Sequence, residues 1–331
     1  MNSAKSKLAL LAVLCLALSA LAPFGGMSLI SPADIFMPGH PDAEVFWRLR
    51  LPRTAASFLA GAGLAVCGMV FQALFRNPLA TPFTLGVSSG ASLGAAVYLS
   101  LGASLSALGS LGSLGAALMG SFISMFLVYS LTRAKGGFST PIMLLAGVII
   151  NFFFSSLVLF LQYVSNAHDS LRIMHWLMGS LSGLEIARLA DLAFAVLGGT
   201  LLIHTLTSEL DLLMAGEELA ASRGLRVRRV KIQLFAIASV IVAAVVSLTG
   251  PIGFVGMMIP HICRIFLGWT HRLLLPASFF LGGCFLTVCD LLSRTLLAPA
   301  EMPVGIITAL IGGPFFLWTL FRTNRARTLF G

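Results

Sequence analysis

Residues 141–164 read PIMLLAGVIINFFFSSLVLFLQYV, an uninterrupted apolar run that contains no Asp, Glu, Lys or Arg. A helix needs about 20 apolar residues to cross the hydrocarbon core of a bilayer. Pro141 stands at the start of the run, where proline is tolerated in the first turn of a helix. The stretch therefore predicts a membrane-spanning helix.

Similar apolar stretches lie on both sides of this run. The shortest, at 254–268, follows Gly-Pro-Ile-Gly and is expected to cross the bilayer obliquely or only in part. The remaining predicted segments are 8–24, 54–74, 84–104, 112–132, 190–207, 233–249, 275–298 and 304–321. Lys5 and Lys7 precede the first of these, as in a cleaved signal peptide or a retained first helix. We expect retention, because the rest of the chain also needs insertion into the membrane.

The composition excludes a large soluble domain. Hydrophobic residues make up 58% of the 331 positions and charged residues 10%, whereas soluble domains carry about 25% charged residues. A chain this apolar must be covered by lipid. The sequence thus predicts an all-α fold, a polytopic membrane helix bundle of about ten transmembrane helices per protomer. The whole chain, 1–331, is expected to form a single transmembrane domain.

The basic residues indicate how the bundle is oriented. With the N-terminus inside and the segments alternating, most of the 21 Lys and Arg residues fall on the cytoplasmic side, as the positive-inside rule requires. Both termini are therefore expected in the cytoplasm. The net charge of +9 is attributed to these loops rather than to nucleic-acid binding. Six arginines fall outside and need another explanation: Arg48, Arg50, Arg53, Arg172, Arg188 and Arg294.

The largest cytoplasmic loop, at about 208–232, contains the pattern of a short helix. Glu217 and Glu218 stand in its first turn and Arg223 in its last, which complements the helix dipole. Gly224 stands where a glycine ends a helix. This helix is either a docking element for a partner or an ordinary capped connector.

Motifs of enzymes and metal sites are missing from the sequence. It contains no G-x4-G-K-[ST], H-E-x-x-H or C-x-x-C pattern. Its five cysteines lie in apolar stretches, its histidines are scattered, and we predict no metal site, cofactor or enzymatic activity. Asp290 is a rare acid within a predicted span, with Arg294 four residues further on the same helical face. The pair either neutralises itself or marks a proton-coupled carrier, although an arginine neighbour argues against a freely titrating Asp290.

Eight strings, in order along the chain, carry a family resemblance. They are RLPRT at 50–54, GAGLA at 61–65, QALFRNPLA at 72–80, LGVSSGA at 85–91, LAGV at 145–148, WLMGSL at 176–181, GFVGMMIPH at 253–261 and EMPVG at 301–305. From about residue 45 to 321 the chain resembles the FecCD-type permeases. These are the inner-membrane subunits of type II ABC importers for ferric siderophores, haem and cobalamin.

The resemblance implies a set of partners. Such permeases work as homodimers, are driven by two separate ATPase subunits, and receive cargo from a periplasmic or lipid-anchored binding protein. An iron complex, either a ferric siderophore or haem, is the expected cargo. Cobalamin or an oxyanion is the alternative within the family, and a proton-coupled secondary carrier or a membrane-embedded enzyme is the alternative outside it.

The resemblance also assigns roles to residues. By position in the motifs, Arg50, Arg53 and Arg294 would receive acidic residues of the binding protein. The segment 212–225 would be the coupling helix that seats in the ATPase, and Ser139 and Thr140 would form the cytoplasmic gate. Five residues of the coupling segment carry this implied role: Glu217, Glu218, Arg223, Gly224 and Leu225.

Overall fold

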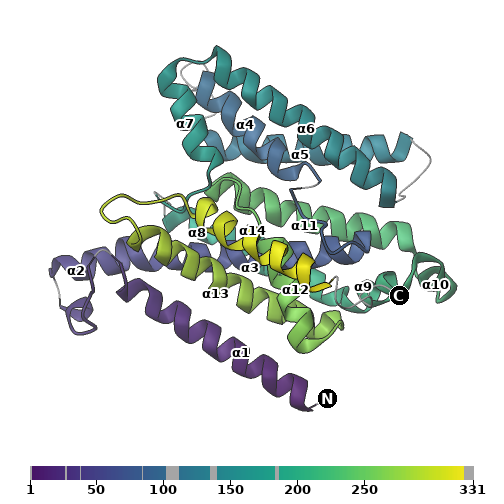
Figure 1. Cartoon of the computed structure of the whole chain (residues 1–331), viewed down its shortest axis with the longest axis horizontal. Coiled ribbons are helices and arrows are strands. Elements are labelled where there is room, and N and C mark those ends of the chain that lie inside the picture. Colours follow the sequence, from purple (N-terminus) through teal and green to yellow (C-terminus); the bar gives the residue numbers. More distant parts are fainter. Residues whose placement is uncertain are drawn as a thin grey trace.

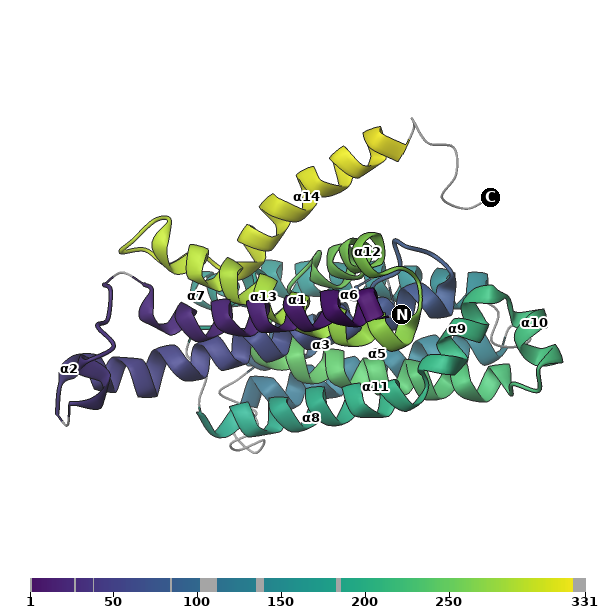
Figure 2. The ribbon, with the colours of Figure 1, turned by 90° about the horizontal axis from the view of Figure 1, so that it is seen from below.

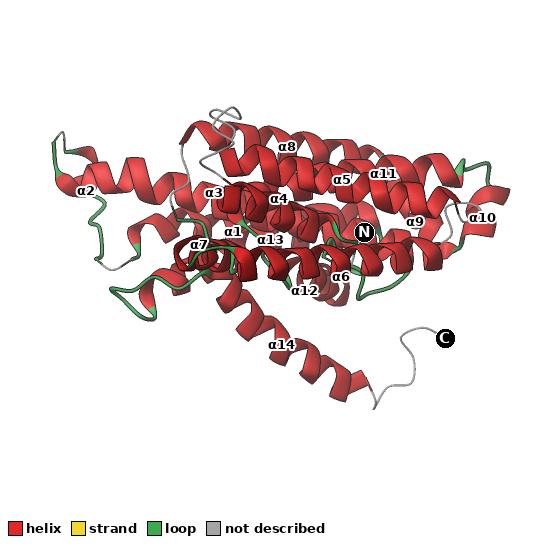
Figure 3. Cartoon of the chain, turned by 90° about the horizontal axis from the view of Figure 1, so that it is seen from above, coloured by secondary structure: helices red, strands yellow, loops and turns green. Residues whose placement is uncertain are grey.

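The structure is a computed structural model that describes residues 2–26, 28–37, 39–83, 85–101, 112–134, 140–182 and 186–323. Within these ranges every regular element is a helix, and no strand occurs (Figure 3). Each of the ten predicted apolar stretches overlaps one of the ten main helices. These are α1 (Asn2–Leu21), α3 (Leu51–Phe75), α4 (Val87–Leu101), α5 (Gly112–Ala134), α6 (Thr140–Val164), α8 (Ile186–Thr205), α11 (Val227–Thr249), α12 (Val255–Leu267), α13 (His271–Thr295) and α14 (Val304–Thr323).

Seven stretches of the described chain are helical, long and apolar enough to cross a membrane. They contain α1, α3, α5, α6, α8, α11 and α13. α12 and α14 are shorter apolar helices, and α4 has 15 residues within the described range. Together they match the expected bundle of about ten spans. α12 has only 13 residues and contains Pro260, consistent with the expected partial crossing.

Several short helices connect the main ones. Six were not predicted: η1 (Ala22–Phe24), η2 (Asp34–Phe36), α2 (Pro41–Glu44), η3 (Val45–Arg50), α7 (Ala167–Leu177) and α9 (Thr207–Ala215). The seventh, α10 (Glu217–Ser222), is the short helix predicted in the largest loop. α7 is amphipathic, so its polar residues conceal it from a search for apolar runs. In addition, α11 and α13 begin before the predicted segments, at Val227 and His271, because hydropathy does not register the basic first turn of a helix.

α3 is the hub of the fold. It packs against α8, α11, α12 and α13, and almost all of its length from Thr54 to Phe75 is buried. Helices α4 to α7 form a second group that α11 joins to the first (Figure 1). α14 leaves the bundle at an angle and exposes apolar side chains such as Leu317 and Phe321 (Figure 2).

Small residues allow the helices of the hub to approach closely. A Cβ added at Gly61 would lie 2.2 Å from the carbonyl oxygen of Gly282 in α13, and one at Gly68 would lie 1.7 Å from that of Gly256 in α12. Helices in lipid lack a hydrophobic driving force between them and associate through such close backbone packing. The GAGLA and GFVG strings are thus the crossing points of α3 with its neighbours.

Candidate functional site

The two ends of the bundle carry the candidate sites. We name them the α2 end, where α3 begins and α13 finishes, and the α10 end, where α9 and α10 lie (Figure 2). The three arginines implied as docking residues all lie at the α2 end. The implied coupling residues all lie at the α10 end.

Arg53 and Arg294 share one buried carboxylate. The Nε atom of Arg53 donates to Oδ1 of Asp290 at 3.0 Å, and Nε of Arg294 lies 3.2 Å from Oδ2. Arg53 also donates through Nη1 to Oε2 of Glu301 at 2.9 Å. Asp290 is 1% exposed, so the two guanidinium groups compensate a charge that would otherwise be costly in the bundle. Glu301 is the most exposed member of this four-residue network, named here the outer charge network.

Arg50 has a different environment from the other two arginines. Its guanidinium is buried and donates to the backbone carbonyls of Pro23, Phe24 and Ser28 at 2.9–3.3 Å. These residues follow α1, so Arg50 ties the end of α1 to the start of α3. The structure therefore brings Arg53 and Arg294 together and places Arg50 against backbone oxygens.

The sequence indicated only part of the outer charge network. The spacing of Asp290 and Arg294 predicted their contact, which the structure confirms. The contact of Arg53 with Asp290 spans 237 positions and leaves no local pattern. The sequence contained only one indication of this contact. An acid within a membrane span is costly, so Asp290 needs a compensating partner somewhere in the bundle.

The segment 212–225 forms two short helices at the α10 end. α9 finishes at Ala215 and α10 runs from Glu217 to Ser222, as its predicted start and stop residues indicate. Gly224 adopts φ +83°, and its N–H donates to Ala221 at 2.9 Å. Left-handed backbone of this kind favours glycine. Leu225 then donates to the carbonyl of Ala220 at 3.0 Å and completes the turn.

The implied coupling residues differ in their exposure. Glu217 binds the buried ammonium of Lys231 in α11, with Oε1 and Nζ 2.5 Å apart. Glu218, Leu219 and Arg223 are exposed. Glu217 therefore anchors α10 to a long helix, while Glu218 and Arg223 face outward from it.

A second contact joins this end to α13. Asp211 in α9 accepts hydrogen bonds from the backbone N–H of His271 at 2.9 Å and from its Nδ1 at 2.6 Å. Partial burial by itself would raise the pKa of Asp211, but the hydrogen bonds from His271 outweigh it and lower that pKa. Asp211 thus caps the N-terminus of α13 from a distant part of the chain.

The implied gate is largely beyond what the structure describes. Ser139 lies outside the described residues, and Thr140 is the first residue of α6, with its side chain not described. A cavity of about 290 Å³ lies beside α3. It is lined by Leu64, Leu79, Thr81, Pro82, Phe83, Gly253, Phe254, Gly256 and Met257. Its lining is largely apolar and its volume is at the small end for ligand sites, so it does not form a passage for a large chelate.

Comparisons with known proteins agree with this architecture. The model of the FecCD transport family matches residues 9–322. The chain is 37% identical to the hemin transport system permease protein HmuU of Yersinia pestis, covering 86% of this chain and 85% of that protein. It is 40% identical to the cobalamin import system permease protein BtuC of Halobacterium salinarum, covering 85% and 74%.

A solved structure is similar over nearly the whole length of this chain. It is described as an inward-facing conformation of a metal-chelate type ABC transporter, with a TM-score of 0.87 and 29% identity. The match covers 96% of this chain and 99% of that one. The all-helical arrangement is thus that of an ABC transporter permease.

Proposed function

The chain belongs to the FecCD transport family, and from this premise we propose that it carries an iron complex, a ferric siderophore or haem, across the inner membrane. As a multi-pass ABC transporter permease it supplies the passage and is not itself an enzyme. ATP hydrolysis is assigned to two separate subunits and cargo recognition to a periplasmic or lipid-anchored binding protein. Residues 1–331 act as one permease domain.

The cargo assignment rests on two similarities, one to a hemin permease and one to a metal-chelate type transporter. Both cargo classes are large metal complexes. Cobalamin is the second candidate, because a relative at 40% identity is a cobalamin permease. All three cargoes need a wide passage with weak contacts. That passage is proposed to lie between two copies of the chain, beside α6 and α14, which expose large apolar side chains such as Phe152 and Leu317.

Docking of the binding protein is assigned to the α2 end, which faces outward in the proposed orientation. Arg53 and Arg294 are engaged by Asp290, yet the Nη2 atom of Arg294 has no hydrogen-bond partner among the described residues. An acidic side chain of the binding protein is proposed to join the outer charge network through these arginines. Arg50 completes the docking set by holding the adjacent segment in place. Charges at the rim of an interface steer and orient a partner.

Coupling is assigned to α10 at the cytoplasmic end. Glu218, Arg223, Gly224 and Leu225 form the face that seats in the ATPase, and Glu217 links that face to α11 through Lys231. Movement of this segment is proposed to tilt α6 and to open the passage alternately to the two sides. Ser139 and Thr140, at the cytoplasmic end of α6, are the proposed gate.

Reconstitution in liposomes tests the proposal. The permease is combined with its ATPase and binding protein, and uptake of haem, a ferric siderophore panel and cobalamin is measured with and without internal ATP. ATP-dependent uptake of haem or a siderophore is the expected result. Uptake of cobalamin alone would replace the cargo assignment. Uptake that needs no ATPase and disappears with the proton gradient would instead identify a secondary carrier.

A further inference from the structure

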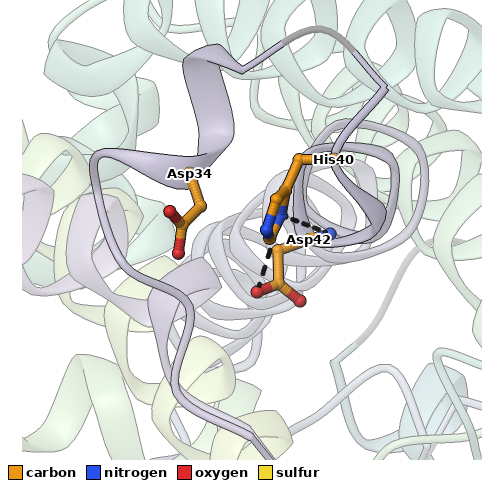
Figure 4. A group of neighbouring side chains, drawn as sticks. All are labelled: Asp34, His40 and Asp42. Atoms are coloured by element: carbon orange, nitrogen blue, oxygen red, sulfur yellow. Dashed lines mark hydrogen bonds and ion pairs between the residues drawn. The ribbon is translucent and has the colours of Figure 1, made fainter.

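A group of three potential metal ligands lies outside the machinery described above. Asp34 of η2 and His40 and Asp42 at the start of α2 each offer one ligand atom, and these atoms all lie within 4.8 Å of one another. The Nδ1 atom of His40 and Oδ2 of Asp42 are 3.9 Å apart. Figure 4 shows the three side chains as neighbours, with a carboxylate oxygen of Asp42 joined to the imidazole ring of His40 and Asp34 beside them. The spacing D-x5-H-x-D matches none of the metal motifs considered from the sequence.

The loop that carries these residues is held by its own small core. Ile30, Ile35 and Phe46 are buried together at the α2 end. The indole N–H of Trp47 donates to the carbonyl of Ile35 at 3.1 Å, next to Asp34 in the chain. These contacts fix the positions of η2 and α2 relative to each other, so the ligands come from a preformed loop.

The three side chains make few contacts with other residues, so their ligand atoms are available to a cation. The carboxylate of Asp34 has no hydrogen bond or ion pair with the described residues, although it is only partly exposed. The Nδ1 atom of His40 accepts the N–H of Asp42 at 3.3 Å, a long hydrogen bond that a metal bond at the same lone pair would replace. Two carboxylates this close repel each other unless a positive charge lies between them.

The donor set selects the class of metal. An imidazole with two carboxylates suits first-row transition metals such as Zn²⁺, whereas Ca²⁺ and Mg²⁺ prefer sites made only of oxygen. Zinc bonds to nitrogen and oxygen of about 2.0–2.2 Å place tetrahedral ligands about 3.4 Å apart. The three side chains would draw together by roughly 1 Å to reach that geometry. Water would complete the coordination at the position that the three side chains leave open.

We propose that Asp34, His40 and Asp42 form a zinc-type divalent cation site that clamps the loop between α1 and α3. The cation is a resident structural ion, distinct from the transported cargo. It closes the loop between η2 and α2, beside the segment that Arg50 fixes through Pro23, Phe24 and Ser28.

Zinc titration of the purified full-length chain tests the proposal. The affinity tag is removed, bound metal is stripped with a chelator, and ZnCl₂ binding is followed by calorimetry and by the unfolding temperature. One Zn²⁺ per chain and a raised unfolding temperature are expected. Asp34→Asn removes a ligand and no described hydrogen bond, and it should weaken binding at least about tenfold. His40→Asn removes the imidazole but retains a residue suited to the cap position, and it should weaken binding similarly.

Control variants separate this cluster from other zinc-binding groups. Glu44→Gln changes a nearby acid outside the cluster, and the double variant His168→Gln/His175→Gln removes exposed histidines of α7. Both should bind zinc as the parent does. Co²⁺ bound in place of zinc should lack a thiolate charge-transfer band, which excludes the buried cysteines as ligands. Absence of stoichiometric zinc binding, retention of it in Asp34→Asn and His40→Asn, or preference for Ca²⁺ or Mg²⁺ over Zn²⁺ would overturn the assignment.

Discussion

Arg53 at the start of α3 and Asp290 near the end of α13 form an ion pair, with Nε and Oδ1 3.0 Å apart, across 237 positions of sequence. The pair joins the two helices at the end opposite to α10. Because Asp290 is also in contact with Arg294, loss of its charge leaves two arginines without their shared partner. The residues implied in docking thus also stabilise the fold.

Asp290→Asn should destabilise the protein strongly. Removing one member of a buried charged group leaves the others uncompensated, which costs about 3–5 kcal/mol. The unfolding temperature of the purified permease in detergent measures this loss. Glu301→Gln serves as the control, because Glu301 is 41% exposed and its pair with Arg53 is worth at most about 1 kcal/mol. Equal effects of the two substitutions would contradict the role given to Asp290.

Charge reversal at two of the arginines proposed for docking should stop transport without releasing the ATPase. In Arg50→Glu/Arg53→Glu an acidic binding protein meets like charge, so uptake should collapse. The substitutions also remove a buried partner of Asp290 and should lower the unfolding temperature, so uptake is compared on permease that still co-purifies with its ATPase. Arg48→Glu is the matched control, because Arg48 is exposed and pairs only loosely with Glu44, at 3.6 Å. Partial rescue by a binding protein whose acids are changed to arginine would separate docking from misfolding. Normal uptake in the double variant would refute the docking assignment.

A feature of the fold or the site was predictable when the residues that determine it lie close together in the sequence. The spans were predictable because each depends on the hydropathy of one continuous stretch, as in residues 141–164. α10 was predictable because Glu217 and Gly224 act within the same turn or two. The contacts of Arg53 with Asp290 and of Asp211 with His271 were not, because each depends on how helices far apart in sequence pack together. The close contacts of the glycines of α3 were not predictable either, because the sequence does not show which helices they meet.

Gly224→Ala should disturb coupling through its backbone. Gly224 has φ +83° and open space around the position of a Cβ, so the cost of about 1–2 kcal/mol is conformational rather than steric. The turn after α10 should shift, and cargo uptake per ATP hydrolysed should fall. Gly198→Ala is the control, because that helical glycine has equally open space without a positive φ. Identical transport ratios in both variants would argue against a coupling role for this turn.

Gly68→Ala should prevent normal packing of α3 against α12. The added methyl group would lie 1.7 Å from the carbonyl oxygen of Gly256, and backbone cannot move aside as a flexible side chain does. Overpacking of this kind costs about 1–3 kcal/mol or more. The yield of folded protein and its unfolding temperature should both drop. Gly313→Ala, with nothing near its added carbon, should leave both unchanged, and a tolerated Gly68→Ala would show that the two helices lie further apart.

Asp211 should contribute stability that disappears in acid. Its pKa is lowered in the folded protein, because the hydrogen bonds from His271 favour the carboxylate more than burial opposes it. Because the pKa of Asp211 is lower in the folded protein than in the unfolded chain, its contribution to stability is fully present above its ordinary pKa of 3.8. The contribution declines as the pH falls through the lower folded value.

The variant Asp211→Asn isolates this contribution. At neutral pH it should lower the stability of the purified permease by about 1 kcal/mol, the typical worth of a helix cap. Between pH 5 and pH 3 the unfolding temperature of the parent should fall more steeply than that of the variant, so that the two curves converge. Asp169→Asn, which alters an acid in the first turn of α7 and away from this contact, should follow the slope of the parent. Parallel curves for the parent and Asp211→Asn would mean that the contact with His271 does not stabilise the charged form.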